Sequence, residues 1–370
     1  GAAPGAAPGA APGAASAEEF DLHGFALPPE GDSVRDSARA YARWFEPKAL
    51  RRSRRFELRR ERLADPSQWT RMPKETLKAM LRKGVPPAHR AEVWWSVLGC
   101  EDRRRASPRG YAQHLERARL AGGSAREEIE RDLRRTFPNH QRFRAEAGQA
   151  ELRNVLSAYA HHSPRVQYCQ GLNFIAALLL VVFQEEEPAF WALVCAVETL
   201  GVESYYTEGM ALLRADTRAL AALLERKCTK VSRALAAAGV DLTAVCSEWF
   251  VTWFSRCLPT ATTLRVWDTL FYEGFKILFR VAVGIFKLVE VEILRCSSFE
   301  EVMEQAKEWP RCMIKHNELL KASFQGVPGL RRKDLLKIRE DALCSVERED
   351  AAARRRRREL RARRAPDEAP

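Results

Sequence analysis

The chain has 370 residues, and 46% of them are apolar, which is enough to bury a sizeable core over part of its length. Its net charge of +12 is concentrated in two arginine-rich runs, residues 51–62 and 348–364, which carry net charges of +5 and +6. Because the rest of the chain is close to neutral, the composition argues against a basic face that binds nucleic acid. The two runs fit solvated flanks, with weak contact to an anionic membrane as the alternative.

The cysteines and the apolar runs predict a cytoplasmic location. The nine cysteines form no CxxC pair and no cysteine–histidine ligand spacing, and several lie inside apolar runs, as expected of reduced, buried thiols. No secretory signal opens the sequence, and its longest apolar run, residues 172–183, is too short to cross a bilayer. We therefore expect a soluble cytoplasmic protein, whose membrane contact would be peripheral.

The chain divides into five segments by composition. Residues 1–15 repeat Gly-Ala-Ala-Pro and are predicted to be disordered. Residues 16–82 form an N-terminal flank that is predicted to be partly helical, and residues 83–294 have the apolar helical periodicity of the main domain. Residues 295–345 fit further helices, and residues 346–370 a basic, disordered tail. Almost no segment alternates with a period of two, so the predicted fold is all-α, with many helices of ordinary length.

Within the main domain, the segment after residue 123 has a clear helical signature. Ser124 and Glu127 have the spacing of a capping box, which predicts that a helix begins there. Ile129, Leu133 and Phe137 follow at helical spacing and form an apolar stripe that would face the core.

The familiar signatures of catalytic and cofactor sites are missing from the sequence. It contains no GxxxxGK[ST] loop, no strand followed by GxGxxG, no HExxH and no GxSxG. His161 and His162 close a predicted helix without a third metal ligand in view. We therefore expect no metal or cofactor of the protein's own and no self-contained catalytic centre.

Two polar segments remain as candidates for a functional site, and the first contains Arg135. At 100° per residue, Arg135 lies about 240° from Ile129 on the helical wheel and so points away from the apolar stripe. Asp132, three residues earlier, is placed to orient its side chain. Periodicity does not separate Arg135 from the equally exposed Arg131, and taken alone a solvated arginine is the simpler interpretation.

The second segment is the predicted loop 164–171, which precedes the long apolar run. Pro164 restricts the backbone where the loop begins, and Gly171 allows a tight conformation where the next helix begins. The amide of Gln170 both donates and accepts hydrogen bonds, so it could orient a water molecule. The competing interpretation is a glutamine that caps the following helix.

These two segments resemble the arginine motif I-x-x-D-x-x-R and the glutamine motif Y-x-Q-G of the TBC (RabGAP) domain family. The other motifs of that family follow in the expected order, and the resemblance covers about residues 83–290. One departure is Gln167, which stands where the family usually has a small residue. The matching positions are Lys83-Gly84-Val85-Pro86 with Arg90 and Trp94; Ile129, Asp132 and Arg135; Tyr168, Gln170 and Gly171; Trp249-Phe250; Leu258-Pro259; Leu264 to Asp268; Glu273-Gly274; and Phe279-Arg280.

The resemblance implies a multi-helix TBC domain that stimulates GTP hydrolysis by a Rab-family small GTPase. Arg135 would be the arginine finger and Gln170 the glutamine finger, both inserted into the GTPase in trans. Arginine supplies a permanent, forked cation for the transferring phosphoryl group, and the glutamine amide would position the attacking water in place of the GTPase's own glutamine. GTP and Mg²⁺ would be bound by the partner.

The resemblance also suggests supporting residues. Asp132, Tyr168 and Gly171 accompany the two fingers in their motifs. Asp268 lies in an apolar helical stripe, so its carboxylate would need an arginine such as Arg90 or Arg265, since unpaired burial is costly. Tyr168 and Trp94 are expected mainly to pack.

Two other functions compete with an active GTPase-activating protein. One is a catalytically weak, Rab-binding scaffold in membrane traffic, which the presence of both fingers disfavours. The other is a basic protein that binds membrane or nucleic acid through its arginine runs. For the active protein, we expect residues 1–60 and 346–370 to be dispensable in solution, because neither segment belongs to the predicted helical core.

Overall fold

In the computed structural model, which describes residues 19–63 and 68–364, every regular element is a helix, and the predicted all-α fold is confirmed. The segment 1–15, predicted to be disordered, lies outside the described residues. Within these residues, extended pairing is confined to two isolated bridges near the N-terminus, Phe20 with Ala26 and Phe25 with His140.

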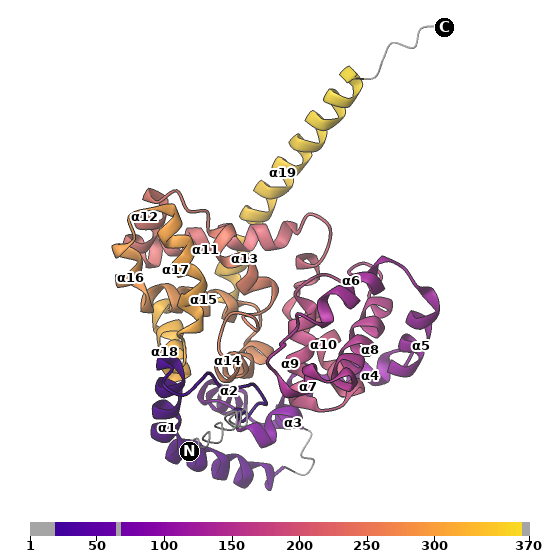
Figure 1. The fold of residues 1–370 in the computed structure, drawn as a ribbon, viewed down its shortest axis with the longest axis vertical. Helices are drawn as coiled ribbons and strands as arrows, with labels where there is room; N and C mark the ends of the chain where they lie inside the picture. The colour runs from indigo at the N-terminus through magenta and orange to yellow at the C-terminus, as the bar shows by residue number, and fades with distance from the viewer. Residues whose placement is uncertain (1–18, 64–67, 365–370) are drawn as a thin grey trace, which may run out of the picture.

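Most of the helices form two groups that lie side by side (Figure 1). The first group consists of α3 (Pro87–Leu98), α4 (Cys100–Ala106), α5 (Tyr111–Ala121), α6 (Ser124–Leu133), α7 (Gln141–Arg144), α8 (Glu146–His162), α9 (Leu172–Phe183) and α10 (Glu186–Leu200). The second consists of α11 (Ala211–Lys227), α12 (Thr229–Ala237), α13 (Leu242–Val251), α14 (Thr260–Glu273), α15 (Lys276–Leu288), α16 (Glu290–Arg295), α17 (Phe299–Arg311) and α18 (His316–Gly326). Helix α14 packs against α3 and α10 as well as against α15 and α18, so it joins the two groups.

The core is centred on three apolar helices. Every residue of α9 from Leu172 to Leu180 is buried, as is every residue of α15 from Ile277 to Phe286. Helix α10 packs on α9 and buries ten of its side chains, which explains why these segments read as continuous apolar runs. Among the described residues, no single helix is long and apolar enough to span a membrane; α12 and α13 meet that test only as a pair bent by 119°.

The described part of the N-terminal flank is largely helical and packs on the folded body. Helix α1 (Ser33–Arg60) is followed by a short 3-10 turn and α2 (Lys74–Lys83). Phe56 of α1 is only 2% exposed and packs in a small second core with Trp69, Leu77 and Val93. The sequence did not indicate this contact, because Phe56 lies within the arginine-rich run, which is typical of a solvated segment.

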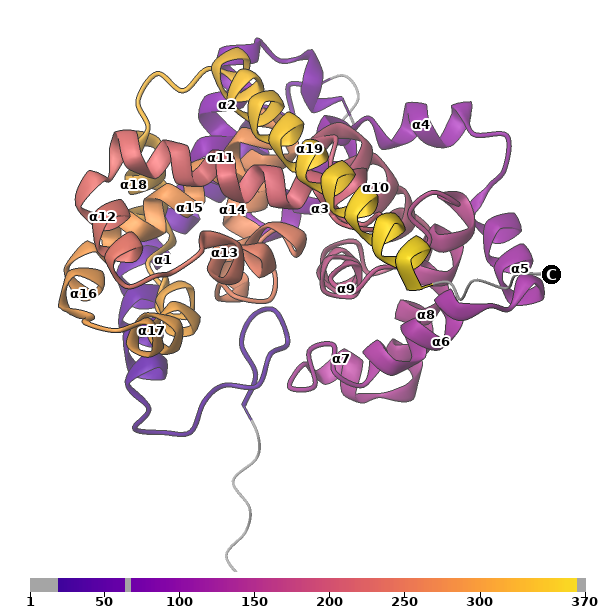
Figure 2. The same cartoon turned by 90° about the horizontal axis from the view of Figure 1, so that it is seen from above.

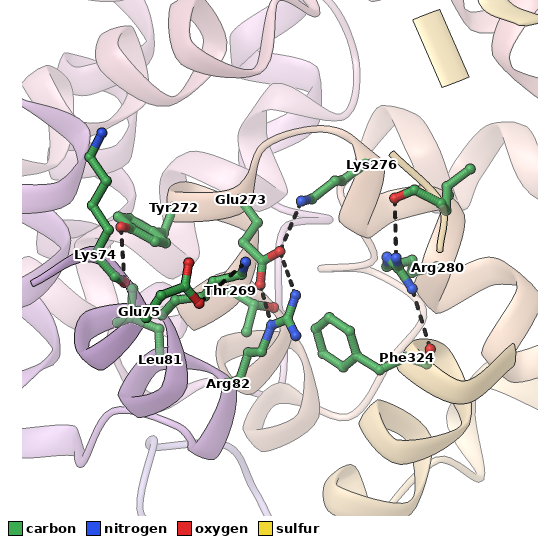
Figure 3. Close-up of polar contacts among 12 residues, drawn as sticks. Lys74, Glu75, Leu81, Arg82, Thr269, Tyr272, Glu273, Lys276, Arg280 and Phe324 are labelled. Atoms are coloured by element: carbon green, nitrogen blue, oxygen red, sulfur yellow. Dashed lines mark hydrogen bonds and ion pairs between the residues drawn. The ribbon is translucent and has the colours of Figure 1, made fainter. Parts of the chain in front are cut away.

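Helix α2 is also tied to the second group by an ion-pair network, shown in Figure 3. Arg82 donates to both carboxylate oxygens of Glu273, at 2.5 and 2.8 Å, and the Lys276 ammonium lies 2.9 Å from the same carboxylate. Burial alone would raise the pKa of Glu273, but its contacts with Arg82 and Lys276 outweigh burial and hold the pKa below its usual value. Arg280, at the right of the figure, donates to the carbonyls of Phe324 and Val327.

The predicted disordered tail from residue 346 is wrong as far as the structure describes it, because α19 (Arg332–Arg364) is continuous through that segment. Its first half lies across α11 (Figure 2), where Arg214 and Arg218 contact Asp350 and Glu349. Beyond these anchors the side chains up to Arg357 are exposed, and the helix projects from the body (Figure 1). Alanine and arginine have high helix propensity, so this composition extends an anchored helix.

Phe56 offers a test of whether the N-terminal flank stabilises the domain. We expect Phe56→Ala to lower the free energy of unfolding by about 3–4 kcal/mol, because it removes a buried aromatic ring from a packed cluster. Leu50→Ala, on the same helix but at a side chain that is 65% exposed, should change it by less than about 0.5 kcal/mol. Urea unfolding of the full chain measures both, and equal effects would contradict the integration of α1.

Candidate functional site

Arg135 lies just beyond the end of α6, in the turn that follows Leu133. The helix begins at Ser124 with Gly123 as its N-cap and without a side-chain cap, so the predicted capping box is not formed. The backbone N–H of Arg135 donates to the Asp132 carbonyl at 3.2 Å, which keeps the turn tight. The Arg135 side chain is 51% exposed and forms an ion pair with the carboxylate of Asp132.

The Asp132 carboxylate is the buried centre of this arrangement. Its side chain is 5% exposed, and its second oxygen accepts a hydrogen bond from the Tyr168 hydroxyl at 2.6 Å. Burial, reinforced by this contact, raises the pKa of Tyr168, so the phenol stays a neutral donor. One carboxylate therefore connects the arginine segment with the segment that carries Gln170.

A second set of hydrogen bonds connects the same two segments through Asn173 and Thr136. The Thr136 hydroxyl donates to the Asp132 carbonyl at 2.7 Å and accepts from the Asn173 amide, also at 2.7 Å. The Asn173 side-chain oxygen in turn accepts from the backbone N–H of Gly171 at 2.9 Å. Thr136 and Asn173 are fully buried. Sequence reasoning missed both residues, although a lone asparagine at the start of the apolar run 172–183 was the available signal.

Gly171 sets the direction in which Gln170 leaves the loop. Its φ of +112° lies in the region that favours glycine, and a Cβ there would come within 3.4 Å of the Val251 carbonyl oxygen. Gln167 has a φ of +54°, in the left-handed region that residues other than glycine adopt less readily. Gln170 itself is exposed.

Arg135 and Gln170 line one surface pocket of about 390 Å³, called here the finger pocket. Arg131 also lines it, and its guanidinium donates to the Glu127 carbonyl of its own helix, at 3.3 Å. Arg135 differs because a buried carboxylate anchors it. The complete lining consists of Glu128, Arg131, Asp132, Arg135, Tyr168 and Gln170.

The other three candidate residues form a separate buried cluster that does not line the finger pocket. The Asp268 carboxylate accepts hydrogen bonds from Arg90 and Trp94, both at 3.1 Å, and from the backbone N–H of Val85 at 2.8 Å. Of the two arginines considered as its partner, Arg90 makes the contact, whereas Arg265 donates to backbone carbonyls of α2. This cluster joins α3 to α14 and has a structural role.

The N-terminal segment packs against the turn that follows Arg135. The Phe25 ring contacts Phe137 edge-on at 5.1 Å, and Phe137 contacts Phe174 of α9 in the same way at 5.3 Å. Phe137 comes two residues after Arg135 and has a φ of +45°. The flank therefore supports the backbone that presents Arg135, a contact that no sequence pattern indicated.

Comparisons with known proteins identify the family of the chain. The family model described as Rab-GTPase-TBC domain matches residues 87–294. The chain belongs to this TBC family. The solved Chlamydomonas flagellar RabGAP TBC domain is 30% identical with a TM-score of 0.69, and the likeness covers 83% of this chain and 99% of that one. The Ypt/Rab-GAP domain of Gyp1p shares the fold at 19% identity, with a TM-score of 0.62 and 75% and 98% coverage.

Curated relatives extend the likeness beyond the TBC domain. Human growth hormone-regulated TBC protein 1, a relative also suggested by the stretches Thr136–Pro138 and Ser204–Tyr206, is 35% identical over 78% of this chain and 83% of its own length. Human TBC1 domain family member 2A is 36% identical over 72% of this chain. The chain spans only 29% of that relative's length.

The hydrogen bonds of Asn173 provide a stability test of the site. We expect Asn173→Ala to lower the free energy of unfolding by about 2 kcal/mol, because the Gly171 N–H loses its acceptor in a buried place. Gln170→Ala, three residues earlier and exposed, should change it by less than about 0.5 kcal/mol. Urea unfolding compares the two variants. An unchanged free energy of unfolding in Asn173→Ala would show that the hydrogen bonds of Asn173 do not stabilise the domain.

Proposed function

We propose that this TBC protein stimulates GTP hydrolysis by a Rab-family small GTPase, with Arg135 and Gln170 inserted in trans. The family supports Rab GTPase activation in general. The observation that supports the specific assignment is that both side chains are exposed at one pocket, while buried side-chain hydrogen bonds join the two segments that carry them. The protein acts as an activator, and the hydrolytic step takes place in the partner.

Arg135 is suited to neutralise charge on the transferring phosphoryl group. A guanidinium has five N–H donors, and the ion pair with Asp132 involves one end of it, Nη2, which leaves further donors for phosphate oxygens. Because the Asp132 contact fixes the side chain beforehand, less conformational entropy is lost when Arg135 meets the phosphates. Asp132 is a positioning residue in this proposal, since it reaches the phosphates only through Arg135.

Gln170 supplies the complementary part of the reaction. Its amide can accept a hydrogen bond from the attacking water and donate one to an oxygen of the phosphoryl group. The hydrogen bond between the Gly171 N–H and Asn173 holds the loop in place. The loop that carries the Gln170 amide is therefore positioned before the reaction begins. GTP and Mg²⁺ belong to the GTPase, and this chain contributes two side chains and a docking surface.

The arginine-rich flanks play no part in that chemistry. We propose that they make weak contact with anionic membrane at the cytoplasmic side, which leaves the hydrolytic step unchanged. The two fingers favour catalysis over the alternative of a Rab-binding scaffold, since a scaffold needs neither exposed side chain.

The finger assignment of Arg135 predicts a graded mutant series. Arg135→Ala should reduce stimulated hydrolysis by about 10³-fold or more, and Arg135→Lys should restore little, because an ammonium cannot form the forked contact. Arg131→Ala, in the same pocket, should retain most activity. Single-turnover GTP hydrolysis by a responsive Rab measures all three, and loss of activity in Arg131→Ala with retention in Arg135→Ala would show that the finger is assigned wrongly.

Gln170 has a matched control in its own loop. Gln170→Ala should slow stimulated hydrolysis by about 10²-fold, since the attacking water loses its positioning group. Gln167→Ala replaces the same residue type three positions earlier and should leave the rate within a few-fold. The same single-turnover assay compares them, and equal rates for the two variants would contradict a glutamine finger.

A further inference from the structure

A groove of about 720 Å³ runs between α1 and α2, and its walls are strongly basic. The positive side chains are Lys48, Arg51, Arg52, Arg55 and Arg59 from α1 and Lys83 from the end of α2. Glu75, at the start of α2, is the one acidic residue in the lining. This basic groove shares no residue with the finger pocket.

The charge in the basic groove is not compensated by the protein. None of its six cationic side chains forms an ion pair with any residue in the described part of the chain, and the exposed Glu75 approaches only Lys78, at 3.9 Å. Burial lowers the pKa of Arg52, and Arg90 adds to this effect, while Asp268 opposes it. Six like charges at one concave surface favour an anionic ligand with several charges of its own.

The helical spacing of these residues adds an aromatic side chain to the same face. Lys48, Arg51 and Arg55 recur at intervals of three and four residues, and Trp44 lies on that stripe one turn earlier. Trp44 is 57% exposed, and the Lys48 ammonium lies 3.1 Å from the centre of its ring. Leu58, also exposed, continues the stripe toward the end of α1.

We propose that the basic groove binds the multiply phosphorylated headgroup of an inositol lipid at a membrane surface. Converging arginines match several phosphates on one ring, whereas a singly charged lipid would need only a flat basic face. Exposed tryptophan and leucine beside the cations fit the interfacial region of a bilayer, which an acidic peptide or a nucleic acid does not offer. The basic groove is separate from the finger pocket, so a negative result for lipid binding would not bear on the proposed stimulation of GTP hydrolysis.

Vesicle co-sedimentation of the full chain tests the proposal. Vesicles of phosphatidylcholine with phosphatidylinositol bisphosphate should bind the protein more tightly than phosphatidylcholine–phosphatidylserine vesicles of equal charge. The double variant Arg51→Gln/Arg55→Gln should weaken the first interaction by about thirtyfold. Arg354→Gln/Arg357→Gln removes the same charge from the projecting end of α19, at the far end of the molecule in Figure 1, and should change binding by less than about threefold.

Two further measurements distinguish a lipid headgroup from a soluble inositol phosphate and check that the groove variant is folded. Trp44→Ala should weaken vesicle binding but leave the affinity for soluble inositol trisphosphate unchanged, because only the lipid surface contacts the indole. Stimulated GTP hydrolysis in solution should be unaffected by Arg51→Gln/Arg55→Gln, which shows that the variant is folded. Equal losses in the groove and α19 variants, equal binding to both vesicle types, or tighter binding to an acidic peptide or to RNA would overturn the proposal.

Discussion

The buried carboxylate of Asp132 is the contact on which the candidate site depends. Taking a carboxylate out of water is costly unless it gains a charge partner and hydrogen bonds. Asp132 gains one partner from each half of the site, the guanidinium of Arg135 and the hydroxyl of Tyr168. The carboxylate therefore favours the arrangement in which the arginine and glutamine segments lie together before any GTPase arrives.

Buried carboxylates paired with arginine also join other parts of the molecule. Asp268 joins α14 to α3 through Arg90, and Glu273 joins the end of α14 to α2 through Arg82. Asp216 of α11 accepts two hydrogen bonds from Arg339 of α19, at 2.6 and 2.8 Å. The side chain of each of these carboxylates is almost fully buried, so removing its arginine would take away a charge partner that offsets the cost of burial. Apolar packing forms the core, and these pairs fix how its helices are oriented against one another.

Much of the fold could be predicted because helical periodicity and the order of short motifs are local properties of the sequence. Ile129 and Leu133 identify the face of α6 that is buried, whereas Arg135 lies in the turn beyond the helix, where the helical wheel no longer applies. The contacts of Asn173 with Thr136 and of Phe25 with Phe137 could not be found in that way, because only the folded structure brings these distant residues close. The helix beyond residue 346 was missed because its basic composition resembles a solvated tail, while its anchors, Arg214 and Arg218, lie more than a hundred residues away.

The account's central claim is that Arg135 and Gln170 act as one unit on the same phosphoryl group. A crystal structure of the complex with a responsive Rab, GDP, Mg²⁺ and aluminium fluoride, which imitates the transferring phosphoryl group, tests it most directly. We expect the Arg135 guanidinium and the Gln170 amide both within hydrogen-bond distance of the fluoride and its in-line water, with Asp132 still bound to Arg135 and Tyr168. A complex in which Arg131 contacts the fluoride, or in which Gln170 lies away from the water, would contradict it.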